Sequence, residues 1–138
     1  MKEKNERVMQ TERRLREHRQ ILERIALMQT RQDKLCAAQA ALRNAGADAE
    51  TVEKLETEIR RNAVSLQLRR LEAASVEAAM GRLTGEERRV LERMLLDPTP
   101  YAADALCEEL CVETATVYRR RKAALEKLSR YLSDEVQP

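Results

Sequence analysis

The residues best suited to chemistry in this chain lie near the start of one strongly basic segment, residues 114–132. Its apolar period begins at Val117, and at about 100° per residue Arg119 and Lys122 point away from that stripe. An arginine can donate two hydrogen bonds to guanine in a major groove, and a lysine can neutralise a phosphate. The pattern therefore indicates a helix that could recognise duplex DNA, with Arg119 as the first candidate to contact a base.

Such a helix needs a partner helix that sets its orientation. Small and apolar residues recur at i, i+3, i+4 and i+7 just upstream, at Ala103, Leu106, Cys107 and Leu110. The period is interrupted at residues 111–113 and restarts at Val117. We therefore predict two helices joined by a three-residue turn, the arrangement of a helix-turn-helix.

A third helix is predicted before this pair. Thr84 and Glu87 have the spacing of a capping box, in which each side chain satisfies a free N–H group of the other residue. The helix is expected to run from about Gly85 to Leu96. The prolines at positions 98 and 100 then stop it, because each lacks an N–H donor.

Charge differs sharply between these helices. Residues 83–111 contain three basic and seven acidic residues, net −4, whereas residues 112–132 contain six basic and two acidic residues, net +4. Positive charge concentrated on one helix favours contact with nucleic acid. The alternative interpretation is that residues 119–122 form a solvated helix face, because antiparallel helix pairs occur in many proteins that bind no DNA.

From Thr84 to Leu128 the chain resembles a known family. The ERRVL opening, the apolar second helix, the short turn and the closing TVYRRRKAALEKL helix resemble region four of bacterial sigma factors. They are more similar still to the sigma-like domain of small phage transcriptional regulators of the ArpU and RinA type. The detailed resemblance covers roughly the last third of the chain. It implies binding to promoter DNA through the second helix of the helix-turn-helix.

The resemblance also implies which side chains meet DNA. Bases would be contacted by Thr114, Ala115, Tyr118 and Arg119, and the DNA backbone by Thr116 and Lys122. Arg120 is a further phosphate contact that we expect from the reach of its own side chain and not from the resemblance. This chain departs from the family at two positions. Glu113 stands where serine or threonine usually caps the helix, and Arg120 stands where the family is usually apolar.

The part before Leu83 has a different pattern. No proline or glycine occurs from Asn5 to Leu42, and Gly46 and Asp48 suit a helix end and a new N-cap. A second helix is predicted to end near Gly81, so the two fold back as an antiparallel hairpin. We assign residues 1–82 to this hairpin and residues 83–138 to the helix-turn-helix domain. The apolar positions expected to support oligomerisation, called the seam below, are Ile21, Met28, Leu35, Leu42, Val52, Leu55, Ile59 and Leu66.

A narrow seam of this kind invites a partner. Two copies could combine their hairpins into a four-helix bundle, which predicts a homodimer, and RNA polymerase or another phage protein is a further candidate partner. The alternative is that the first helix packs on the C-terminal domain of its own chain.

Composition limits the other classes of function. Aromatic residues make up 2% of the 138 residues and charged residues 36%, which favours an all-α protein with a core of leucine, alanine and methionine. No membrane span or signal peptide is expected, and three cysteines without a pairing pattern suit a reducing cytoplasm, which the resemblance implies is that of a bacterial host. Cys107 and Cys111 lack the partners of a metal site, and no catalytic cluster is apparent. We expect no cofactor, no small-molecule substrate and no enzymatic activity.

Two other functions fit the same pattern. Small terminase subunits join a helix-turn-helix to helical assembly segments and recognise DNA for packaging, and they would form rings rather than dimers. A sigma-like domain that binds polymerase and never DNA is the second alternative. It is favoured if the net −4 surface of residues 83–111 is the contact surface.

Overall fold

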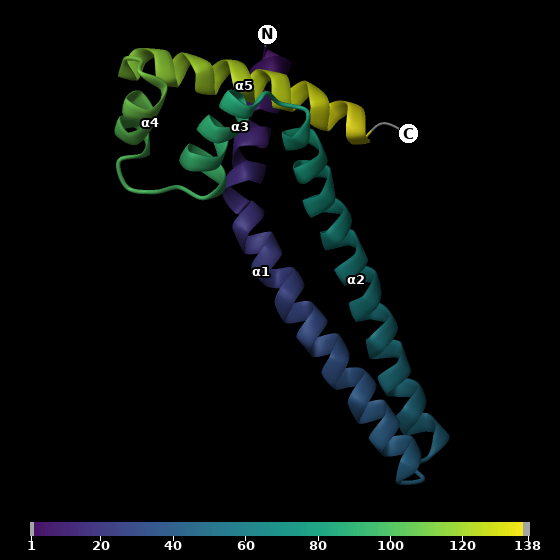
Figure 1. Ribbon diagram of the computed structural model, residues 1–138. Helices are drawn as coiled ribbons and strands as arrows, with labels where there is room; N and C mark the ends of the chain where they lie inside the picture. Colours follow the sequence, from purple (N-terminus) through teal and green to yellow (C-terminus); the bar gives the residue numbers. More distant parts are fainter. Residues whose placement is uncertain (1, 137–138) are drawn as a thin grey trace. The chain divides into compact units, whose positions relative to one another are not determined.

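The computed structural model describes the backbone of residues 2–136 and the side chains of residues 2–133. Within this range the chain contains helices and turns and no strand, so the all-α expectation is confirmed. The elements in Figure 1 are α1 (Lys2–Asn44), α2 (Ala49–Gly81), α3 (Gly85–Leu91), the π-helical turn η1 (Glu92–Leu96), α4 (Ala102–Leu110) and α5 (Thr114–Val136).

Two compact units divide the chain, and both long helices contribute to each. Unit 2 is Gln20–Ala73, and unit 1 combines the residues up to Arg19 with those from Ala74 onward. The first turns of α1 therefore belong to the same unit as α3, α4 and α5.

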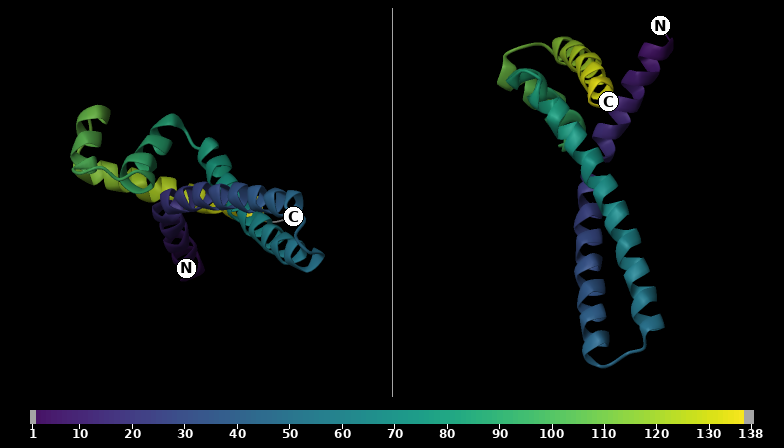
Figure 2. Two further views of the ribbon diagram at one scale, coloured as in Figure 1. Left: turned by 90° about the horizontal axis from the view of Figure 1, so that it is seen from below. Right: turned by 90° about the vertical axis from the view of Figure 1, so that its right-hand side faces the viewer.

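In unit 2, α1 ends in a glycine turn and α2 runs back beside it (Figure 2). Gly46 has φ 75°, as expected for its left-handed position. The Ala47 N–H donates to the Leu42 carbonyl at 2.9 Å and the Gly46 N–H to the Arg43 carbonyl at 3.1 Å, which is the bonding of a Schellman motif. The Asp48 carbonyl then accepts from the Val52 N–H at 3.2 Å, so Asp48 occupies the N-cap position of α2.

Polar side chains fix the register of the two helices in unit 2. Asn62 Nδ2 donates to the Met28 carbonyl at 3.1 Å and to Gln32 Oε1 at 2.7 Å, and Gln32 Nε2 donates to the Ile59 carbonyl at 3.1 Å. Gln39 and Glu56 are hydrogen-bonded nearer the turn. Residues of increasing number on α1 meet residues of decreasing number on α2, so the pairing is antiparallel.

The seam residues lie in unit 2. Ile21 and Leu66 are buried and the other six are half-buried. Met28 lies one turn from Gln32 on α1, and Ile59 lies one turn from Asn62 on α2, and both polar side chains bond across to the other helix. The seam side chains on these faces are therefore directed between the two helices. Their role in self-association stays a prediction.

In unit 1 the start of α3 has the expected capping box. Glu87 N–H donates to Thr84 Oγ1 at 3.2 Å, and Thr84 N–H donates to Glu87 Oε1 at 2.9 Å. The helix ends at Leu96, before the two prolines, but its last five residues widen into η1. There the Asp97 N–H reaches the Glu92 carbonyl at 2.8 Å, an i to i+5 bond that the sequence pattern did not indicate.

The core of unit 1 includes the beginning of α1. Leu15 has no exposed surface and packs with Leu91, Leu95 and Leu128. At the edge of this core Glu12 forms an ion pair with Arg121 of α5. The first part of α1 therefore packs on the C-terminal helices of its own chain, as the alternative to a partner-bound first helix predicted.

Candidate nucleic-acid interface

The turn between α4 and α5 is closed by backbone hydrogen bonds. Cys111 adopts a left-handed conformation, φ 56° and ψ 46°, and its N–H donates to the Cys107 carbonyl. The Val112 N–H reaches the same carbonyl at 3.1 Å. This caps α4 without a glycine, although a Cβ atom is disfavoured in that conformation.

α5 begins at Thr114, one residue after the unusual Glu113. The Glu113 carbonyl accepts hydrogen bonds from the Thr116 N–H at 3.0 Å and the Val117 N–H at 3.2 Å. Glu113 therefore occupies the N-cap position by its backbone, and Thr114 is the first residue of the helix rather than its cap.

A small apolar cluster holds the first half of α5. Val117 of α5, Leu106 of α4 and Val90 of α3 are each fully buried and pack together, with Cys107, Leu110 and Val112 around them. This contact fixes which side of α5 faces inward. The opposite side is left on the surface.

The predicted base-contacting residues lie on that outer side. Thr114, Ala115, Tyr118 and Arg119 are all exposed, and Tyr118 is 49% exposed. Lys122 is exposed one turn further along. The structure thus brings five of the seven predicted contact residues to one exposed surface, which we call the α5 outer face.

Two local contacts orient side chains on the α5 outer face. Arg119 Nη2 donates to Thr116 Oγ1 at 3.1 Å, one turn earlier in the same helix. Thr114 Oγ1 lies 3.5 Å from Cys107 Sγ, which ties the first residue of α5 to α4. The Arg119 guanidinium has further N–H donors that this single bond leaves available.

The next two arginines are directed elsewhere. Arg120 forms an ion pair with Glu86 of α3, and Arg121 forms one with Glu12 of α1. The predicted phosphate contact Arg120 is half-buried and lies beside the α5 outer face. Of the basic run 119–122, the described structure leaves Arg119 and Lys122 without an acidic partner.

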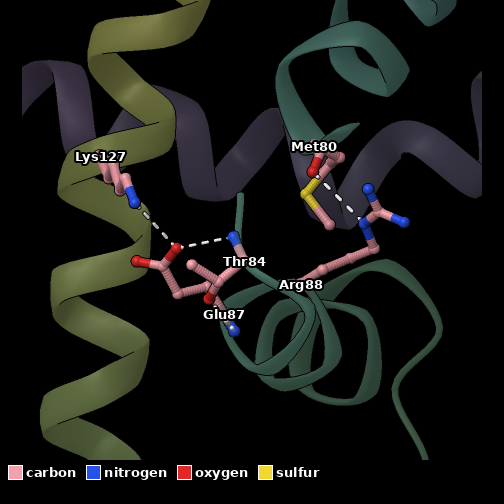
Figure 3. Close-up of polar contacts among 5 residues, drawn as sticks. All are labelled: Met80, Thr84, Glu87, Arg88 and Lys127. Atoms are coloured by element: carbon pink, nitrogen blue, oxygen red, sulfur yellow. Dashed lines mark hydrogen bonds and ion pairs between the residues drawn. The ribbon is translucent and has the colours of Figure 1, made fainter. Parts of the chain in front are cut away.

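Figure 3 shows how α3 is held to α5 and to the end of α2. Lys127 Nζ donates to Glu87 Oε1 at 3.0 Å, and Arg88 Nε donates to the Met80 carbonyl at 3.3 Å. Partial burial raises the pKa of Glu87, but hydrogen bonds from the Thr84 N–H and from Lys127 outweigh it and hold this pKa below its ordinary value. The same contact with Glu87 raises the pKa of Lys127.

Much of the negative charge of α3 and α4 is paired. Glu109 of α4 meets Arg89 of α3 and lies 3.6 Å from Arg93 Nη2 of η1. Glu86 and Glu87 are paired with α5. These ion pairs tie the three helices together and reduce the net field of the acidic segment.

A second basic surface lies between α1 and α5. A groove of about 360 Å³ is lined by Arg7, Gln10, Thr11 and Arg14 of α1 and by Ser129, Leu132 and Ser133 of α5. The sequence pattern did not indicate this groove, because the arginines are separated from α5 by about a hundred residues. The positive charge of the first helix is the signal that could have drawn attention to it.

No metal centre forms from the described residues, where no three side chains of histidine, cysteine, aspartate or glutamate gather. Within the same range none of the helices combines the length and the apolar character that a membrane crossing requires. Comparison of the chain with protein family models, with curated proteins and with solved structures gives no match.

Proposed function

We propose that this protein is a sequence-specific double-stranded DNA-binding transcriptional regulator of phage or prophage type, acting in the cytoplasm of a bacterial host. In this proposal α5 enters the major groove. Thr114, Ala115, Tyr118 and Arg119 contact bases, and Thr116, Arg120 and Lys122 contact phosphates.

The observation that supports the proposal most directly is that the first turns of α5 expose one side while the other side is held by the buried Val117. Val117 is fully buried, while Thr114, Ala115, Tyr118 and Arg119 around it are exposed. A helix that enters a groove needs this combination, because its inner side must be rigid and its outer side free of protein.

The charge arrangement supports the same function. Among the described residues Arg120 and Arg121 are paired with carboxylates, so Arg119 and Lys122 can meet DNA without giving up an ion pair, whereas Arg120 must leave Glu86 to contact a phosphate. An arginine that reaches a guanine contributes sequence discrimination, whereas a lysine on a phosphate contributes affinity that falls with salt. The two residues are therefore expected to behave differently on mutation.

The test is a selection of binding sites. Purified protein is mixed with fragmented DNA of its source genome at near-physiological salt, and the retained fragments are sequenced. Sharp enrichment upstream of a transcription unit supports the proposal. Enrichment at a packaging locus would favour a small terminase subunit, and no enrichment would favour a polymerase-binding protein.

A further inference from the structure

α2 carries apolar side chains on two opposite faces within unit 2. One face holds Leu55, Ile59 and Leu66, and its neighbour Asn62 bonds to the backbone of α1. This face is directed toward α1. At about 100° per residue, Val64 lies on the other side of the helix, roughly 180° away.

The second face presents a continuous apolar stripe. Val64, Leu68 and Leu71 follow at i, i+4 and i+7, so their side chains line one side of α2. They are 61%, 61% and 56% exposed. α1 of unit 2 cannot cover this stripe, because it packs against the opposite face. Exposed apolar side chains gathered in this way mark an interaction surface.

The charges beside the stripe indicate what covers it. Arg61 and Glu72 both lie on one flank, at about 60° and 80° from Val64, and Arg60 and Gln67 lie on the other flank. In an antiparallel pair of identical helices, each flank meets the same flank of the partner. Centred between Val64 and Leu71, such a pair places Arg61 of each copy about 3 Å along the axis from the level of Glu72 of the other, an offset that these long side chains span.

We propose that the stripe Val64, Leu68 and Leu71 is a self-association surface, on which α2 of a second copy packs in antiparallel orientation. The three apolar side chains interdigitate at the centre, and two symmetric Arg61 to Glu72 pairs close one flank. Glu72 also lies 3.1 Å from Arg69 Nη1 in its own helix, so its carboxylate serves both arginines.

Charge favours the antiparallel arrangement over the parallel one, although Arg60 Nε lies 3.6 Å from Glu56 Oε1 in its own helix. In a parallel pair opposite flanks meet at the same height, which would place Arg61 beside Arg60 of the partner. Like charges there would oppose association. The surface is distinct from the seam, whose side chains are directed between α1 and α2 of one chain, and the inference does not depend on DNA binding.

The test is sedimentation equilibrium of the full chain at about 1 to 100 µM. We expect a dimer, and Leu68→Lys is expected to raise its dissociation constant at least about tenfold. Leu27→Lys is the matched control, because Leu27 is 71% exposed in the same unit but lies on α1. Circular dichroism verifies that both variants keep the helical content of the wild type.

Charge reversal tests the orientation. Arg61→Glu and Glu72→Arg are each expected to weaken the dimer, and the double variant to restore it. A monomer at every concentration, or a dimer equally insensitive to Leu68→Lys and Leu27→Lys, would overturn the proposal. A stronger dimer with Arg61→Glu alone would indicate parallel packing and overturn the antiparallel arrangement.

Discussion

Lys127 Nζ lies 3.0 Å from Glu87 Oε1, the same oxygen atom that accepts the N–H of Thr84. One carboxylate therefore caps α3 and holds that helix to the middle of α5. Because α3 also supplies Val90 to the cluster under α5, the cap contributes to the orientation of the α5 outer face.

Removal of the Thr84 hydroxyl tests the first part of this contact. Thr84→Ala leaves the Glu87 N–H without its acceptor, so we expect the free energy of unfolding to fall by about 1 kcal/mol. Thr84→Ser keeps the hydroxyl and is expected to stay close to the wild type. Urea denaturation followed by circular dichroism measures both, and equal losses in the two variants would contradict the capping role.

The pH dependence of stability is expected to depend on His18. This side chain is 7% exposed, and among the described residues its Nδ1 atom has no hydrogen-bond partner. Burial lowers the pKa of His18, Glu77 acts in the opposite direction with an oxygen 3.8 Å from Nε2, and Arg14 lowers this pKa further. The folded state therefore favours neutral His18, and stability decreases as pH falls from about 6.5 toward the lowered pKa.

His18→Gln removes this ionisation. We expect the wild type to lose stability between pH 7 and pH 5 and the variant to lose less over the same interval, as measured by urea denaturation. Glu12 and Glu87 do not interfere, because their pKa values are lowered from 4.5 and their contributions to stability are lost only in more acidic solution. Parallel curves for the two proteins would show that His18 plays no part.

A glycine at position 111 should stabilise the protein. Cys111 is exposed and has φ 56°, a conformation that a side chain with a Cβ atom disfavours. Cys111→Gly is expected to raise the free energy of unfolding by about 0.5–1 kcal/mol, after the greater freedom of glycine in the unfolded chain is subtracted. Cys111→Ala keeps the Cβ atom and should give no gain. If Cys111→Ala raised the free energy of unfolding by the same amount, relief of left-handed backbone strain could not be the cause of the gain.

Local features of the fold could be predicted from the sequence. The capping box of Thr84 and Glu87, the left-handed Gly46 and the helix ends at Gly81 and Leu96 are all confirmed. Each depends on residues close together in the chain, whose backbone preferences and hydrogen bonds are local. The all-α class follows from the same helical periodicity.

Contacts between distant residues could not be predicted in the same way. Periodicity places Leu15 on an apolar face but does not identify what covers it, and in the structure it packs with Leu91 and Leu128. The pairing of Arg120 with Glu86 likewise joins helices whose mutual orientation no spacing in the sequence gives. The exposure of the α5 outer face could be predicted from the helical period. Once Val117 is placed inward, a rotation of about 100° per residue determines which side chains of α5 face outward.

The central claim is that Arg119 on the α5 outer face recognises a base. The most direct measurement compares binding of an enriched duplex and a scrambled duplex, by fluorescence anisotropy over a range of salt concentrations. We expect Arg119→Ala to reduce the preference for the enriched site by about 1–3 kcal/mol, and Lys122→Ala to weaken both duplexes equally while lowering the salt slope by about one unit. Equal losses on both duplexes for Arg119→Ala, or no preference in the wild type, would contradict the account.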